Sequence, residues 1–140
     1  MPRLAKGGKW VFGWAVVGGG RQIRLPAEAL GEYRLVPGTG IAFIGGSRTS
    51  GGFGIGRLEA LTGNRWLGKR VIASGSMGRD GLVRLPPEVG AEPGERLLMV
   101  RWSGLALGLI RRGPIYRIAQ GHPEIEEFAP GRGGETEISP

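Results

Sequence analysis

The chain has 140 residues, which is enough for one domain with a single hydrophobic core. It contains no cysteine and one histidine, His122, which excludes disulfides, thiolate chemistry and histidine-based zinc clusters. Lys and Arg outnumber Asp and Glu by 19 to 12, a net charge of +7, and a basic protein of this kind attracts polyanions.

The N-terminal part predicts a strand over residues 11–17, a glycine turn and a short second strand. In the second strand Ile23 and Leu25 face one side and Arg24 faces the other. Pro26 has no N–H to donate, so it ends this strand and suits the start of a short helix.

The same part of the chain bears on localisation. Its longest apolar run, residues 10–17, is far shorter than the roughly 20 residues of a spanning helix. No export signal is apparent. We therefore expect a soluble cytoplasmic protein that has no membrane partner.

A turn, a hairpin and a connector complete the first half. Pro37 and Gly38 have turn chemistry, with proline at the second position and glycine at the third. The apolar runs 41–44 and 53–56 are expected to pair as a hairpin. Residues 57–68 then form a connector that begins with a helical turn.

The second half repeats the first. Residues 9–26 align with residues 69–86 without a gap, and a Pro-Gly turn and a hairpin follow in both copies. We therefore expect a strand over 71–74, a short strand that ends at Pro86, and a hairpin of 97–101 with 105–110. The identical pairs at this offset are Lys9/Lys69, Val11/Val71, Gly18/Gly78, Arg24/Arg84, Leu25/Leu85, Pro26/Pro86 and Glu28/Glu88.

This order of elements resembles the AbrB/MazE/SpoVT group of swapped-hairpin barrels. The family phrase runs Ile-Pro-x-x-x-Arg-x-x-Leu-Gly-Ile-x-x-Gly-Asp. The segment LPAEALGEYRLVPGT, Leu25 to Thr39, keeps the family spacing from Pro26 to Gly38. The second copy, LPPEVGAEPGE, keeps the ends of the phrase and shortens the helix. The resemblance covers about residues 9–56 and 69–110.

The resemblance implies an all-β fold with one or two short helices, arranged as a swapped-hairpin barrel. Single-copy members are normally homodimers, because a copy of about 45 residues buries too little apolar surface alone. Two copies in one chain therefore imply an intrachain pseudo-dimer, one barrel domain over residues 1–118 built from repeats 9–56 and 69–110. A further homodimer of whole chains is left open.

The family's usual activity is DNA binding by transcription regulators and antitoxins, so the resemblance implies a regulator that binds duplex DNA. The charge favours the same partner, because residues 1–118 carry 18 Lys and Arg against 7 Asp and Glu. Gln22, Leu82 and Leu30 stand where the family has arginine, and we expect Arg24 and Arg84 to compensate, since they match between the copies. The candidate phosphate contacts are Arg21, Arg24, Lys69, Arg70, Arg79 and Arg84.

Two other kinds of function fit the composition. A protein-interaction module, either an antitoxin-like neutraliser or a scaffold, would use the basic surface to bind an acidic partner without DNA. A barrel for a small ligand is the third alternative. The acidic residues form no catalytic motif, so we expect no enzyme, no cofactor and no metal. Tryptophans can stack on bases, but Trp10 and Trp14 share one strand face, which favours packing.

Residues 119–140 differ from the rest of the chain. They carry one arginine against five glutamates and are rich in glycine and proline, which predicts a disordered tail. This tail either folds back on the basic surface as an acidic mimic of phosphate or is only a solubilising extension.

Overall fold

The computed structural model describes residues 10–46 and 51–130. The first repeat contains β1 (Val11–Val16), β2 (Gln22–Arg24), α1 (Ala27–Tyr33), β3 (Gly40–Gly45) and β4 (Phe53–Arg57). Helices α2 (Leu58–Thr62) and α3 (Arg65–Gly68) connect it to β5 (Val71–Ser76), β6 (Leu82–Arg84), β7 (Arg96–Arg101) and β8 (Leu107–Ile110). The chain continues into α4 (Pro114–Gln120) and β9 (Glu127–Phe128). Three 3-10 turns are η1 (Gly19–Arg21), η2 (Arg79–Gly81) and η3 (Pro87–Val89).

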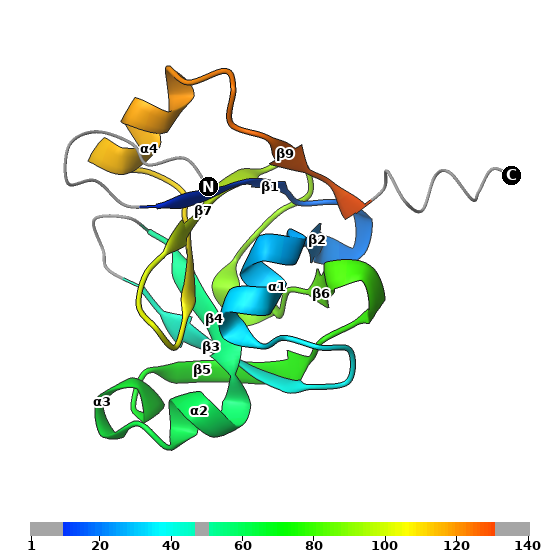
Figure 1. Cartoon of the computed structure of the whole chain (residues 1–140), viewed down its shortest axis with the longest axis vertical. Helices are drawn as coiled ribbons and strands as arrows, with labels where there is room; N and C mark the ends of the chain where they lie inside the picture. The colour runs from blue at the N-terminus through cyan, green and yellow to red at the C-terminus, as the bar shows by residue number, and fades with distance from the viewer. Residues whose placement is uncertain (1–9, 47–50, 131–140) are drawn as a thin grey trace, which may run out of the picture.

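Seven strands form one sheet in the order β5-β3-β4-β8-β7-β1-β9, and β2 and β6 form a separate ribbon. All of the pairings are antiparallel except that of β1 with β9. The first strand of each repeat pairs with the other repeat, β1 with β7 and β5 with β3. Figure 1 shows α2 and α3 near the β5 end of this sheet and α4 near the β1 end. None of the helices in the described ranges is long and apolar enough to cross a membrane.

The prediction of a closed barrel is wrong. Strands β5 and β9 stand at the two ends of the sheet, and no pairing among the described strands joins them. Pro26 and Pro86 follow β2 and β6 closely, so these strands stay three residues long and form a second layer instead of closing the sheet. The fold is strand-rich and mainly antiparallel, and it has four short α-helices in the described ranges where the sequence predicted one or two.

The main core lies between the large sheet and the β2–β6 ribbon. Ile23 and Val83 face each other across the ribbon and are at most 1% exposed. They pack in one cluster with side chains of α1 and of the sheet, including Phe43, Ile55 and Leu97. The ribbon therefore covers the core on the side opposite the sheet, and the burial of Ile23 and Val83 holds the ribbon against the sheet.

Alternation along the strands gives the sheet two further apolar clusters on its other face. Trp14 and Leu98 pack with α4, and Ala42 and Ile44 pack with α2. Each helix follows the second strand of a hairpin, so α2 and α4 cover equivalent places in the two repeats.

Residues 119–130 differ from the disordered tail that the sequence predicts. Ile125 is 5% exposed, and the N–H of Trp14 donates to the carbonyl of Glu126 at 2.8 Å. Glu127 in β9 forms an ion pair with Arg96 at 2.9 Å. This segment is therefore packed against β1, and residues 131–140 lie outside the described residues.

Tyr33 gives the fold a pH dependence. Its hydroxyl is buried and has no hydrogen-bond partner among the described residues. Burial raises the pKa of Tyr33 to about 12, and the carboxylate of Glu32 adds to the rise while Arg101 opposes it. As the pH increases above 10 the unfolded chain loses this proton first, so stability falls between about pH 10 and pH 12.

Tyr33→Phe is expected to lose less stability than the wild type on going from neutral pH to pH 11. At neutral pH it is expected to gain up to about 1 kcal/mol, because a buried hydroxyl without a partner is removed. Urea denaturation at both pH values measures the two effects. Equal losses in the two proteins would contradict the role given to Tyr33.

Candidate nucleic-acid interface

The β2–β6 ribbon and its turns bring together four of the six predicted basic residues. In the ladder Gln22 lies opposite Arg84, and Arg24 lies opposite Leu82. Turn η1 precedes β2 and carries Arg21, and turn η2 precedes β6 and carries Arg79. The strands are antiparallel, so the two turns lie at opposite ends of the ribbon.

The two turns share one backbone conformation. Gly20 and Arg21 have φ of 69° and 58°, and the equivalent residues Asp80 and Gly81 have φ of 56° and 77°. Each turn therefore places two consecutive residues in the left-handed region, and one of the two is glycine. The non-glycine residue is the second of the pair in η1, Arg21, and the first of the pair in η2, Asp80, and both are exposed.

Arg24 and Arg84 each reach the turn of the other repeat. Arg24 Nη1 donates to the carbonyl of Asp80 at 2.6 Å, and Arg84 Nη1 donates to the carbonyl of Gly20 at 3.3 Å. Gly20 and Asp80 are themselves equivalent in the two repeats. The repetition of the Arg-Leu-Pro sequence therefore has a structural reason, because each arginine donates a hydrogen bond to the turn of the other repeat.

Arg24 and Arg84 differ in exposure and in the number of hydrogen bonds that they donate. Arg24 is half-buried and also donates to the carbonyls of Ala129 at 3.4 Å and Pro130 at 3.3 Å. Arg84 is exposed. The described part of the C-terminal segment, which ends at Pro130, thus covers one of the two matched arginines through the backbone carbonyls of Ala129 and Pro130.

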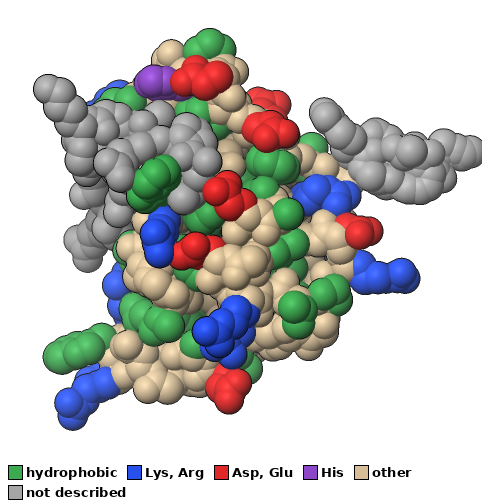
Figure 2. Space-filling view, viewed as in Figure 1, with side chains coloured by type: hydrophobic (Ala, Val, Ile, Leu, Met, Phe, Trp, Pro, Cys, Tyr) green, Lys and Arg blue, Asp and Glu red, His purple; other side chains and the backbone are tan. Residues whose placement is uncertain are grey.

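Of the four ribbon arginines, Arg21 and Arg79 are the most accessible to a ligand. Both are exposed, and neither side chain forms an ion pair within residues 10–46 and 51–130. Asp80, also exposed, follows Arg79 and lowers the local positive charge. Figure 2 shows basic side chains together with acidic ones at the side of the molecule where Figure 1 places β2 and β6.

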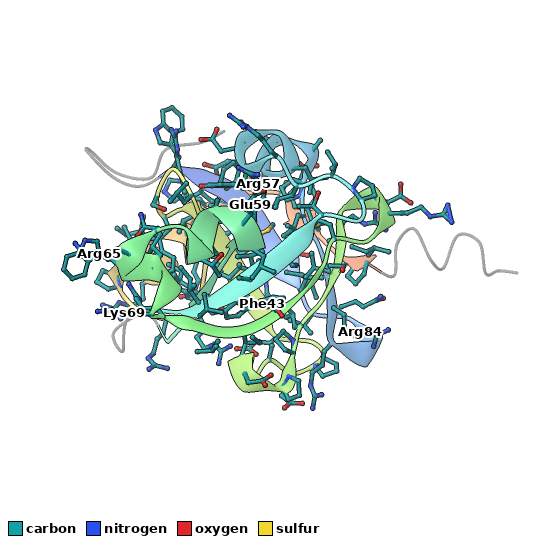
Figure 3. The ribbon with its side chains drawn as sticks, turned by 90° about the horizontal axis from the view of Figure 1, so that it is seen from below. Phe43, Arg57, Glu59, Arg65, Lys69 and Arg84 are labelled. Atoms are coloured by element: carbon teal, nitrogen blue, oxygen red, sulfur yellow. The ribbon has the colours of Figure 1, made fainter. Side chains whose placement is uncertain are left out.

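Lys69 and Arg70 do not join the ribbon. They lie between α3 and β5, and Figure 3 shows Lys69 and Arg84 at opposite sides of the molecule. Arg70 donates to the carbonyl of Gly45 and lies over the ring of Trp102, 5.1 Å from its centroid. The six candidates therefore divide into a ribbon group of four and a separate pair.

The hydrogen-bond acceptors of Arg24 and Arg84 were not identified from the sequence. The carbonyls of Gly20 and Asp80 carry no side-chain signature, although the offset of the repeat aligns them with each other as it aligns the two arginines. Arg96 was missed as well: its guanidinium lies 4.2 Å from the centroid of the Trp14 ring and pairs with Glu127. No local pattern predicts that contact, because the three residues come from β7, β1 and β9.

Among residues 10–46 and 51–130, no group of three or more His, Cys, Asp or Glu side chains could bind a metal ion. Two cavities of about 140 and 180 Å³ lie beside α1 and beside α4, away from the ribbon, and are smaller than typical small-molecule sites. No protein-family model, curated protein or solved structure matches the chain. Its function must therefore be inferred from its own residues.

Proposed function

We propose that the chain binds duplex DNA as a transcription regulator of the AbrB type and that the β2–β6 ribbon is the contact surface. The observation that carries the proposal is the placement of exposed Arg21 and Arg79 in equivalent turns at opposite ends of one ribbon, although Arg21 is the last residue of its turn and Arg79 the first. A two-stranded ribbon fits the major groove of B-DNA. Approximate two-fold symmetry in a protein matches the symmetry of a duplex site.

The same proposal includes a swapped-hairpin pseudo-dimer. Its support is the exchange of strands between repeats, in which β1 pairs with β7, β5 with β3, β2 with β6 and β4 with β8. The family spacing from Pro26 to Gly38 supports the same organisation. The proposed pseudo-dimer is open, since β5 and β9 remain at the ends of the sheet.

The arginines of the ribbon have different parts in this proposal. Arg21 and Arg79 contact phosphates, because their side chains are exposed and carry no ion pair in the described ranges. Arg24 and Arg84 hold the two turns in place through the carbonyls of Asp80 and Gly20. Exposed Arg84 also adds positive charge to the surface.

Binding is expected to weaken steeply as salt rises, because phosphate contacts release counterions. The double variant Arg21→Asn, Arg79→Gln removes two such contacts, and asparagine suits the left-handed backbone of residue 21. We expect the slope of log K against log salt to fall in magnitude by about 2. Fluorescence anisotropy with a labelled random duplex, from low to moderate salt, measures both slopes.

The matched control is Arg34→Asn, Arg117→Gln. It also removes two exposed arginines, one of them from a left-handed position with φ of 55°. Neither residue belongs to the ribbon, so the slope is expected to stay within error of the wild type. No binding by the wild type even at low salt would overturn the DNA proposal, and equal slopes for both double variants would overturn the choice of surface.

A further inference from the structure

Strands β1 and β5 are equivalent in the two repeats, but their outer edges differ. Strand β9 pairs in parallel with the outer edge of β1, with Glu127 opposite Trp14. Strand β5 is the last strand at the other end of the sheet, and no described strand pairs with its outer edge. Its side chains are largely exposed, and Ile72 is 42% exposed. One repeat therefore has a covered edge and the other an open one.

The backbone of β5 presents hydrogen-bonding groups at this edge. Met77 uses both of its backbone groups toward the β3 side, through Thr39 and Gly38 at 2.8 Å each. Since an antiparallel ladder alternates, Ser76 and Ser74 direct their N–H and C=O groups outward. The repeat supports this assignment independently, because Trp14 is equivalent to Ser74 and donates its N–H outward to Glu126.

The surroundings of the edge are basic and apolar. Residues 69–78 contain two basic residues and no acidic one, and Arg65 precedes them on α3. Figure 3 places Arg65 and Lys69 on the side where β5 begins. Trp66 on α3 is 72% exposed. Edge strands usually carry a charge or a proline that prevents pairing, and the VIASGS sequence of β5 has neither.

The chain itself shows what kind of segment such an edge accepts. The segment that lies along β1 reads EIEEF, residues 124–128, and combines three acidic with two apolar side chains. Ile125 is buried in a cluster with Trp14, and Glu127 pairs with Arg96 at 2.9 Å. An extended acidic segment would meet complementary charge beside β5 as well, from Arg65 and Lys69.

We propose that the outer edge of β5 is a docking site for an extended acidic segment of a partner protein. The segment adds to the sheet as a strand parallel to β5 and accepts a hydrogen bond from the N–H of Ser74. Its acidic side chains lie near Arg65 and Lys69, and its apolar side chains contact Ile72 and Trp66. The site lies apart from the β2–β6 ribbon, so it does not depend on DNA binding.

A capped peptide with the sequence PEIEEFAP, residues 123–130 of this chain, is the probe. Titrated into the full ¹⁵N-labelled chain at low salt, it is expected to shift the amides of residues 72–76 most, in a saturable way. Ser74→Pro removes the outward N–H and is expected to weaken binding at least about tenfold, which is 1.4 kcal/mol. Ser74→Ala keeps the N–H and is expected to bind like the wild type.

A second variant distinguishes a loss of binding from a folding defect in Ser74→Pro. Arg65→Gln, Lys69→Gln is expected to weaken binding by roughly tenfold at low salt, while Arg34→Asn, Arg117→Gln removes the same charge elsewhere and leaves it unchanged. The peptide PQIQQFAP is expected to bind more weakly than PEIEEFAP.

Three results would overturn the proposal. The first is the absence of saturable shifts at millimolar peptide. The second is a set of shifts centred on β1, which would mean that the peptide displaces β9. The third is a dimer of the peptide-free chain that Ser74→Pro dissociates, since the edge would then belong to a second copy.

Discussion

Replacing Trp14 with alanine is expected to lower the free energy of unfolding by about 3–5 kcal/mol. Trp14 is 2% exposed and lies among the largest buried side chains of the fold. The guanidinium of Arg96 lies 4.2 Å from its ring centroid, and the ring of Tyr116 meets it edge-on at 5.0 Å. Alanine would leave a cavity between β1 and α4 and would remove both contacts. Urea denaturation followed by far-ultraviolet circular dichroism measures the loss.

Trp66→Ala is the control for this substitution. Trp66 is 72% exposed, so its replacement is expected to change the free energy of unfolding by no more than about 0.5 kcal/mol. Equal losses for the two variants would contradict the packing role of Trp14. Hydrogen exchange adds a local readout, because the amides of residues 126–128 are expected to exchange faster in Trp14→Ala than in Trp66→Ala.

The Trp14 cluster also bears on the proposed DNA surface. The segment that this cluster anchors continues to Ala129 and Pro130, whose carbonyls accept hydrogen bonds from Arg24. The sequence offered two roles for the acidic tail, masking of the basic surface or simple solubilisation. The described part of the tail lies against one end of the ribbon, so its anchoring residues and the exposure of Arg24 are physically coupled.

Local chemistry explains why most strands and turns could be predicted from the sequence. Apolar runs after the Pro-Gly turns identified both hairpins, and Pro26 and Pro86 marked the places where the ribbon strands stop. Because the second half repeats the first, each element predicted in the first half was also predicted in the second. Helix α1, Ala27–Tyr33, is the short helix predicted after Pro26, and its Ala29 and Tyr33 both reach the core.

Features that depend on distant partners could not be predicted in the same way. Strand β9 has only two residues and no strand-forming run, and it exists because Ile125 fills a cluster with Trp14 and Leu98. The open edges of the sheet depend on which segments cover β1 and β5, which no local pattern records. The sequence placed Arg24 opposite the apolar face, but its acceptors are backbone carbonyls that any residue type supplies.

Cutting the chain between Gly63 and Asn64 is expected to leave two fragments, neither of which folds alone. Within each repeat the described hairpin β3–β4 or β7–β8 is retained, and an isolated hairpin is marginally stable at best. The ladders β1–β7, β3–β5, β2–β6 and β4–β8 all join one repeat to the other and would be lost. The cut preserves the side-chain cap that Asn64 provides for α3. Each fragment is therefore expected to show no cooperative thermal transition.

Mixing the two fragments in equal amounts is expected to restore near-ultraviolet circular dichroism and a cooperative transition, with a midpoint that rises with concentration. The comparison is a chain that ends at Arg112, which lacks α4 and β9 but keeps all four ladders between the repeats. It is expected to unfold cooperatively at a lower temperature than the whole chain, because the cluster around Trp14 is lost while the main core remains. Independent folding of either fragment would mean that each repeat buries its own apolar face, and the strand exchange would then add nothing essential to stability.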